Sequence, residues 1–243
     1  MKYIAIISLW LISSGLSAQT ADQIIQNVDA NMSAKNQIVK SSMTIHGKRR
    51  SRTLSSVTYS VGSKKSFTEY LAPSREKGTK MLKLEDKLWI YSPGTDRTLL
   101  ISGHMLRQSV MGSDLSYEDM MDDRKLHEVY DSKIEKIESY NGRPVYILKL
   151  TANTDDIAYH SRKLWIDKER YVPLREDLFA KSGKLLKRTT LSDIKRINGR
   201  WFPMTILYKD MLKQGKGTEI KISDIKFNQT IDDFRFSKAA LKK

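Results

Sequence analysis

The chain has 243 residues, no cysteine and a formal net charge of +15. Without cysteine, this sequence has no disulfide, no thiolate metal site, no cysteine nucleophile and no acylated N-terminal cysteine. The length suits one large β-rich domain or two small ones, and because no linker or internal repeat divides it, we predict one domain. The basic residues are scattered along the chain, and together with predicted export this favours an anionic membrane surface over nucleic acid as a partner.

Residues 1–18 have the features of an export signal. Lys2 supplies a positive charge, residues 3–12 form an apolar stretch too short to span a bilayer, and residues 15–18 are mostly small. We therefore predict cleavage near Ala18 and a mature chain, residues 19–243, in the periplasm. Leu16 is large for position −3 relative to cleavage after Ala18, so a retained N-terminal anchor is the alternative.

The mature chain begins with a predicted helix. Thr20 and Gln23 have the spacing of a capping box. Ala21, Ile25 and Val28 then recur at helical spacing. This pattern predicts an amphipathic helix of about three turns that packs one face on a sheet.

Short runs with alternating apolar residues follow this helix. Val39 and Met43 share one face of the first predicted strand, and Val57 and Tyr59 share one face of the next. Polar turns at residues 47–52, 62–64 and 85–87 separate these runs. Alternation interrupted by short polar turns is typical of antiparallel hairpins.

A methionine-rich segment, residues 103–125, interrupts the strand pattern. It contains Met105, Met111, Met120 and Met121, four of the ten methionines. Methionine is flexible and polarizable, so it suits surfaces that accept apolar partners of varied shape. We predict that residues 103–121 form a movable lid over a sheet and that they bind an apolar ligand. Simple packing on the core is the alternative interpretation.

The strand pattern resumes after this segment. Asn141-Gly142 is a strong type I′ turn signal between two alternating runs, and residues 181–184 and 198–200 mark further hairpins. About eleven strands are expected in total. The predicted fold is mainly β, with a single curved antiparallel sheet or incomplete β-barrel, an N-terminal helix and a helical lid insert. Its concave face is either filled with side chains or left open as a ligand cavity.

Several runs of the sequence are similar to one family, the exported LolA-like outer-membrane lipoprotein-sorting proteins. The most specific run is Met-Gly-Ser-Asp-x-Ser-Tyr-Glu-Asp at residues 111–119. The resemblance extends in order and spacing through nearly all of residues 19–243. Its other parts are Pro73, Gly78-Thr79, residues 89–93, Arg97, residues 164–167, Pro173 and residues 199–203.

The resemblance implies an incomplete antiparallel barrel wrapped around helices, with an apolar cavity that shelters the acyl chains of lipids or lipoproteins. It also implies that an arginine on an early strand helps to hold the lid. Arg49, Arg50 and Arg52 are the candidates, and no motif selects among them.

The predicted site consists of two sets of residues. Cavity and lid candidates for lipid binding are Leu82, Leu84, Trp89, Tyr91, Met105, Leu106, Met111, Leu115, Met120, Met121 and Trp165. The motif shared with the family comprises Gly78, Thr79, Met111, Gly112, Ser113, Asp114, Tyr117, Glu118 and Asp119. For the strand aromatics, burial in the core is the default interpretation, and a position in the cavity wall is the functional one.

Four carboxylates at the end of the lid are the best candidates for a metal or acid–base site. Glu118 and Asp122 are one helical turn apart, as are Asp119 and Asp123, and oxygen ligands at that spacing can hold a hard cation. Acids in a first helical turn also stabilise the helix dipole, which is the interpretation we favour. The four histidines lack a zinc spacing, and no catalytic or phosphate-binding motif is present. We predict no enzyme activity, no cofactor and no metal.

The sequence therefore predicts a periplasmic carrier that binds lipid or lipoprotein acyl chains and passes them between envelope membranes or to and from a transporter. The predicted partners are an inner-membrane transporter and an anionic membrane surface, and the protein is expected to be a monomer. The alternative is a periplasmic adaptor of an RND-type or ABC lipid transporter without cargo of its own. A hydrolase acting on envelope material would require Asp114, Glu118 and Asp119 to converge in a cleft.

Overall fold

The computed structural model describes residues 19–122 and 124–243. The predicted export signal, residues 1–18, and Asp123 lie outside the described residues. Within the described part, one antiparallel sheet contains 13 strands in the order β6-β5-β4-β3-β2-β1-β13-β12-β11-β10-β9-β8-β7. A mainly β fold with a single antiparallel sheet is thereby confirmed.

The strands and helices have the following bounds. The strands are β1 Asn36–His46, β2 Ser51–Val61, β3 Lys65–Ala72, β4 Lys80–Leu84, β5 Lys87–Ser92, β6 Arg97–Ile101, β7 Tyr130–Tyr140, β8 Arg143–Ala152, β9 Ser161–Asp167, β10 Pro173–Phe179, β11 Leu185–Ile197, β12 Arg200–Asp210 and β13 Gly217–Phe227. The α-helices are α1 Ala21–Met32, α2 Tyr117–Met121 and α3 Leu126–Val129. The 3-10 turns are η1 Gly103–Arg107, η2 Val110–Gly112, η3 Asp233–Phe236 and η4 Lys238–Leu241.

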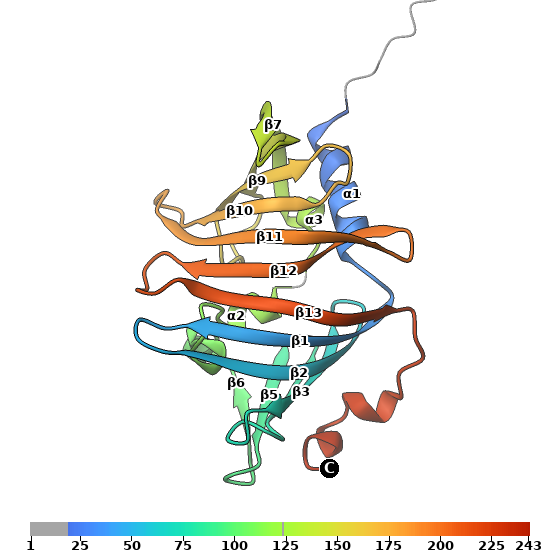
Figure 1. The fold of residues 1–243 in the computed structure, drawn as a ribbon, viewed down its shortest axis with the longest axis vertical. Coiled ribbons are helices and arrows are strands. Elements are labelled where there is room, and N and C mark those ends of the chain that lie inside the picture. The colour runs from blue at the N-terminus through green and yellow to red at the C-terminus, as the bar shows by residue number, and fades with distance from the viewer. Residues whose placement is uncertain (1–18, 123) are drawn as a thin grey trace, which may run out of the picture.

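The order of the strands explains why a lid exists. The chain runs outward from β1 at the centre to β6 at one edge, and it returns inward from β7 at the other edge to β13, which pairs with β1. Figure 1 shows these first and last strands, in blue and red, side by side in the middle of the sheet. Residues 102–129 must therefore cross from one edge of the sheet to the other, and we call this crossing the lid.

The sheet is open, as predicted for a curved sheet or incomplete barrel, because β6 and β7 are its edges and do not pair with each other. One detail of the prediction is corrected: the described residues form 13 strands instead of about eleven. Strand β6 was not predicted, since only Ile101 of its five residues is buried and no apolar alternation marks the strand.

Helix α1 forms as predicted and packs on one half of the sheet. The Thr20 hydroxyl accepts from the Gln23 backbone N–H at 3.2 Å, and the Gln23 side chain accepts from the Thr20 N–H at 3.0 Å. This capping box satisfies two backbone donors at the start of the helix. The apolar face of α1 packs on β8 and β9 in a cluster with buried Ile24, Ile25, Val28, Leu148, Leu150, Leu164 and Ile166.

The predicted hairpin turns are also present. Asn141 and Gly142 both have positive φ angles, 50° and 75°, between the paired residues Tyr140 and Arg143 of β7 and β8. A type I′ turn requires positive φ at both central positions, which glycine and asparagine tolerate best.

The opposite face of β3 to β5 is covered by the C-terminal turns. Phe236, Ala240 and Leu241 of η3 and η4 pack on Phe67, Leu82 and Trp89. Because successive strand residues point to opposite faces, Leu82 lies on this side while its neighbour Met81 faces the lid. Among the described helices, none is long and apolar enough to span a bilayer.

Candidate functional site: the lid and the cavities beside it

The lid rests on an apolar area of the sheet. Its apolar side chains pack against buried side chains of β1 to β6, which form one cluster with Val110 of the lid itself. The lid residues in this contact are Met105, Leu106, Met111, Leu115, Tyr117, Met120 and Met121, and the sheet residues are Met43, Leu54, Tyr70, Met81, Leu88 and Ile101. The six predicted apolar lid residues are therefore brought together on one surface.

The family motif begins with a backbone conformation that few residues adopt. Met111 and Gly112 have positive φ angles of 50° and 70°. This bend presents the Met111 carbonyl to Arg52, whose guanidinium donates a hydrogen bond to it. Of the three arginines that the resemblance offered, Arg52 on β2 is the one that contacts the lid.

Asp114 attaches the middle of the lid to the β12–β13 hairpin. Its carboxylate accepts from the Asp210 backbone N–H at 2.9 Å and from the Thr218 hydroxyl at 2.8 Å. The Asp114 backbone N–H in turn donates to the Thr218 hydroxyl at 2.9 Å. Asp114 and Thr218 are buried, so these bonds replace water contacts that both groups lost on folding.

The end of the lid is held by charged side chains of β9 and β11. Ser116 caps α2, and Asp119 completes the capping box while also pairing with Lys187 and accepting from the Tyr159 hydroxyl. Burial acts to raise the pKa of Asp119, but the Lys187 ammonium and these hydrogen bonds outweigh it and hold the pKa below its ordinary value. Asp119 is therefore an ionised anchor of the lid.

A second ion pair lies one turn further along the lid. The Asp122 carboxylate accepts from the Arg162 guanidinium of β9 at 2.7 Å. Arg162 also donates to the Tyr130 hydroxyl at 2.8 Å and lies over its ring. Two of the four carboxylates considered as metal ligands, Asp119 and Asp122, thus bind cations of the protein. No group of three metal-ligating side chains occurs among residues 19–122 and 124–243.

A cavity of about 350 Å³ lies between α1, the end of the lid and strands β9 to β12. Its apolar lining comes from Val28, Met32, Leu126, Pro173, Leu178, Leu191 and Ile206. Its polar lining includes Asp119, Asp122, Arg162, Glu176, Lys187 and Tyr208. The cavity is therefore amphipathic and differs from the wholly apolar cavity that the resemblance implied.

Glu176 is the unusual member of this lining. Its pKa is raised by burial, although the Arg162 guanidinium partly opposes that effect. Burial and the Glu176 carboxylate also raise the pKa of Tyr208. None of the described side chains donates a hydrogen bond to the Glu176 carboxylate, which leaves it available to a ligand in the cavity.

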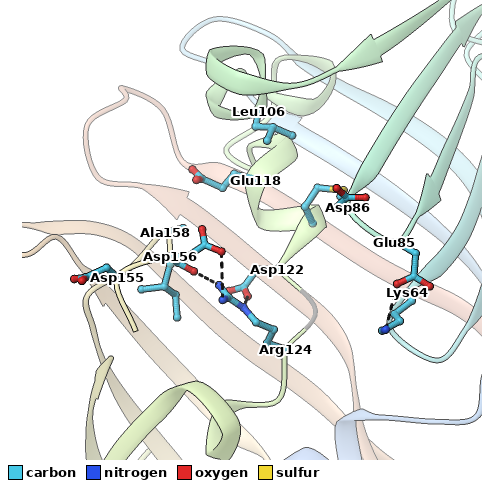
Figure 2. A pocket seen from close by; sticks show the side chains of 12 residues that line it. Lys64, Glu85, Asp86, Leu106, Glu118, Asp122, Arg124, Asp155, Asp156 and Ala158 are labelled. Atoms are coloured by element: carbon cyan, nitrogen blue, oxygen red, sulfur yellow. Dashed lines mark hydrogen bonds and ion pairs between the residues drawn. The ribbon is translucent and has the colours of Figure 1, made fainter. Parts of the chain in front are cut away.

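A wider cleft of about 560 Å³ opens between the lid, the first hairpins and residues 155–158. Figure 2 shows the charged side chains that line this cleft. Arg124 lies between Asp122 and Asp156, and Lys64 pairs with Glu85 at 3.2 Å. Leu106 and Met121 of the lid are among the few apolar residues in the lining. The cleft lies along the edge of the lid, and because most of its lining is charged, it is suited to water and polar groups.

The remaining predicted cavity residues lie on the other face of the sheet. Leu82, Leu84, Trp89 and Tyr91 pack with the C-terminal turns. Trp165 packs with Val145, Ile147 and Leu174, under the Arg175 guanidinium at 4.2 Å from its ring centre. The structure separates these five side chains from the lid, because their positions alternate with those facing it.

The motif residues shape the backbone around the lid. Gly78, with a φ angle of 82°, and Thr79 end the β3–β4 loop and exchange backbone hydrogen bonds with Tyr70. Ser113 is fully buried, the Tyr117 N–H donates to the Gln108 carbonyl at 3.1 Å, and Glu118 lines the wide cleft. Asp114 and Glu118 both line a groove of about 300 Å³ beside the lid, whereas Asp119 is not part of that lining. Asp114 and Asp119 are bound to separate partners.

Three residues that line the cavity under α1, Arg162, Glu176 and Tyr208, were not predicted from the sequence. A signal for Arg162 was present, because it shares the strand face of buried Leu164 and Ile166. A charge on an inward face is rarely placed there without a partner. Its partners lie on separate segments, so the sequence did not identify them.

Comparisons with known proteins agree with this architecture. A protein-family model described as "Uncharacterized protein" matches residues 62–243. No curated protein matches the chain. A Vibrio parahaemolyticus domain assigned as an outer membrane lipoprotein-sorting protein is 26% identical, with a TM-score of 0.80, over 92% of this chain and 98% of that one.

Two further solved structures have the same fold. A DUF1329 family protein from Desulfovibrio piger is 25% identical, with a TM-score of 0.80, over 91% of this chain and 97% of that one. A LolA superfamily protein from Nitrosomonas europaea is 23% identical, with a TM-score of 0.74, over 92% of this chain and the whole of that one, 100%. With its open sheet, its crossing lid and its motif at residues 111–119, the chain has a LolA-like fold similar to that lipoprotein-sorting domain, and it belongs to the family whose model matches residues 62–243.

Proposed function

We propose that this protein is a periplasmic carrier that shelters the acyl chains of a lipid or lipoprotein beneath its lid. The observation that carries this proposal is the contact between the methionine-rich underside of the lid and the apolar area of β1 to β6. The similarity to a lipoprotein-sorting domain supports it. Residues 1–18 would direct export with cleavage near Ala18, and residues 19–243 would act as one carrier domain.

The lid must move for cargo to enter, because its side chains cover the apolar area in this conformation. Each buried methylene of an acyl chain contributes about 0.8 kcal/mol, which offsets the lid contacts that it replaces. Methionine side chains adapt to a new partner with little loss of packing. The lid is otherwise held by polar contacts at its margins, each with a net contribution of about 0.5–1.5 kcal/mol.

The amphipathic cavity under α1 suggests which kind of cargo fits. Its volume of about 350 Å³ lies within the ordinary range for ligand pockets. A hydrocarbon alone would leave the Glu176 carboxylate without a partner, at a cost of about 1–3 kcal/mol. An amphiphile whose polar head donates hydrogen bonds to Glu176, with its chains under the lid, satisfies both surfaces.

Photo-crosslinking tests this location directly. The mature chain would be loaded with a fatty acid or phospholipid that carries a diazirine on its acyl chain, irradiated and digested. We expect crosslinks to Met105 and Met120 on the underside of the lid, and to Met81 and Leu88 in the apolar area of the sheet that the lid covers. Trp89 and Trp165 on the opposite face serve as internal controls, and they should remain unlabelled.

Native mass spectrometry of protein from its own cell envelope provides the complementary measurement. We expect the carrier to retain lipid or lipoprotein when detergent is avoided. Bare polypeptide in repeated preparations, together with crosslinks spread over both faces, would contradict the carrier function. That result would favour the adaptor of a lipid transporter, whose docking needs no cargo.

A further inference from the structure

One end of the sheet gathers three hairpin tips. They are residues 47–50 between β1 and β2, residues 180–184 between β10 and β11, and residues 211–216 between β12 and β13. The Lys216 N–H donates to the His46 carbonyl at 3.3 Å, and the Met211 N–H donates to the Leu186 carbonyl at 2.8 Å, so the third tip touches the bases of the other two. Figure 1 shows all three along the left side of the sheet, and we call them the rim.

The rim is basic, and none of its own residues is acidic. The three tips carry three, two and two cationic residues, and they contain no aspartate or glutamate. These cations, all exposed, are Lys48, Arg49, Arg50, Lys181, Lys184, Lys213 and Lys216. In the part of the chain that the structure describes, only Lys213 among them pairs with a carboxylate, that of Asp210 at 3.6 Å.

Two large apolar side chains project from the same rim. Met211 and Leu212 are 40% and 60% exposed at the β12–β13 tip. Turns are ordinarily occupied by glycine, asparagine, aspartate, proline and serine, so two apolar residues here need a separate explanation. Their backbone is held in place, since the Leu212 N–H donates to the Asp210 carboxylate at 3.0 Å. The side chains therefore stand at a fixed point between lysines.

From this arrangement we infer that the rim docks on an anionic lipid bilayer, with Met211 and Leu212 entering the interface between the surrounding cations. Lysine and arginine near an anionic membrane contribute about 1 kcal/mol each. Apolar side chains flanked by basic residues are typical of proteins that bind at the membrane surface. Protein–protein interfaces are depleted of lysine, which favours a bilayer over a protein partner for this surface.

Docking at the rim would act directly on the lid. Lys213 of the apolar tip donates to the Ser113 carbonyl at 2.8 Å and to the Ser109 hydroxyl at 2.5 Å. Its ammonium cannot keep these bonds while it turns to a lipid phosphate, so the bilayer competes with the lid for Lys213. A groove of about 300 Å³, lined by Leu212, Lys213 and Ser116, runs between the tip and the lid. This coupling rests on the carrier function proposed above, whereas docking does not.

Vesicle co-sedimentation of the mature chain tests the docking. The vesicles would contain phosphatidylethanolamine with phosphatidylglycerol, or phosphatidylcholine alone, at about 0.1 M salt. We expect binding to the anionic vesicles only, and weakening as salt is raised. The combined substitution of Lys48→Gln, Arg49→Gln and Arg50→Gln should reduce binding by about a hundredfold, given about 1 kcal/mol per cation. M211S with L212S should weaken binding at constant charge.

Two control variants separate docking from general effects. Lys133→Gln, Lys149→Gln and Lys226→Gln together remove the same charge from exposed positions outside the rim, and Ile137→Ser removes an exposed apolar residue of β7. We expect both controls to bind like the unmodified chain. Equal loss in rim and control variants would overturn the proposal, because binding would then depend on net charge alone.

Two other results would also overturn the proposal. One is wild-type protein that does not co-sediment with anionic vesicles. The other is protein that binds native membranes but not protein-free vesicles of the same lipids, which would assign the rim to a membrane protein. Cargo measured in the same preparations keeps this test separate from the carrier function, since rim variants should retain cargo whether or not they dock.

Discussion

Glu176 of β10 lines the cavity under α1, and its surroundings shift its pKa in two opposite directions. Removal from water disfavours the carboxylate form, while the Arg162 guanidinium favours it. The first effect is larger, so the pKa of Glu176 is raised. Burial of the Glu176 carboxylate therefore costs stability at neutral pH, and side chains with pKa values perturbed in this way are frequent at functional sites.

Replacement of Glu176 by glutamine should raise the melting temperature at neutral pH. Because the folded-state pKa of Glu176 is raised, the folded protein takes up a proton at a higher pH than the unfolded chain does. The wild type therefore gains stability as pH falls through that raised pKa, whereas Glu176→Gln does not. Thermal unfolding over a pH series should show the difference shrinking on acidification to about pH 4.

The exposed Glu128→Gln is the matched control, and it should show no such pH-dependent difference. A lower melting temperature for Glu176→Gln at neutral pH would contradict the expectation. It would mean that attraction between Glu176 and Arg162 outweighs the cost of burial.

At the scale of elements, the lid has an apolar underside and polar attachments at its margins. The apolar contacts are non-directional and can be exchanged for an acyl chain. Hydrogen bonds to Asp114, Asp119 and Asp122 are directional and select one closed position. A lid built in this way can close in one defined position and still accept varied cargo.

Asp119→Asn should make the lid open more readily at neutral pH. The pKa of Asp119 is lowered in the folded protein, so its contribution to stability is complete above about pH 4, the ordinary value, and is lost as pH falls through the lowered pKa. Because the chain has no cysteine, a single Leu106→Cys substitution permits attachment of a polarity-sensitive fluorophore under the lid.

The fluorophore should report a wetter environment in Asp119→Asn at neutral pH, and the unmodified lid should approach the same signal in strong acid. Asp193→Asn, at an exposed position of β11, is the control. An identical signal for Asp119→Asn and the unmodified lid at every pH would show that Asp119 does not hold the lid.

At the scale of the whole molecule, the two faces of the sheet have separate roles. The lid and α1 cover one face, and the C-terminal turns cover the other face of β3 to β5. Damage to the C-terminal turns should therefore lower stability without removing the proposed lipid site under the lid.

Phe236→Ala should lower the free energy of unfolding by about 3–5 kcal/mol, the usual cost of truncating a buried aromatic side chain. Phe234 in the same turn is 43% exposed, so Phe234→Ala should cost much less. Urea unfolding measures both. At temperatures where the Phe236→Ala variant is folded, photo-crosslinking should still label the residues under the lid. Loss of these crosslinks in the folded variant would place the cargo on the face covered by the C-terminal turns.

Much of this fold could be predicted from local signals. The capping box at Thr20, the turn at Asn141-Gly142 and the alternating runs each depend on residues a few positions apart, and the structure contains all three. Strand β6 has no such signal, because it is a short edge strand with four exposed residues. The pairing of β1 with β13 joins the ends of the chain, and no turn in the sequence indicates it.

The candidate site divides in the same way. The lid was recognised from its methionines and its motif, because composition and spacing are properties of one segment. The separation of Trp89 and Trp165 from the lid depends on which face of the sheet is covered, which is decided by packing between segments far apart in the chain. The Arg162, Glu176 and Lys187 lining and the three-tip rim arise because the sheet brings distant strands together. Local chemistry specifies each element, whereas the burial and pairing that give charged residues their roles exist only in the folded chain.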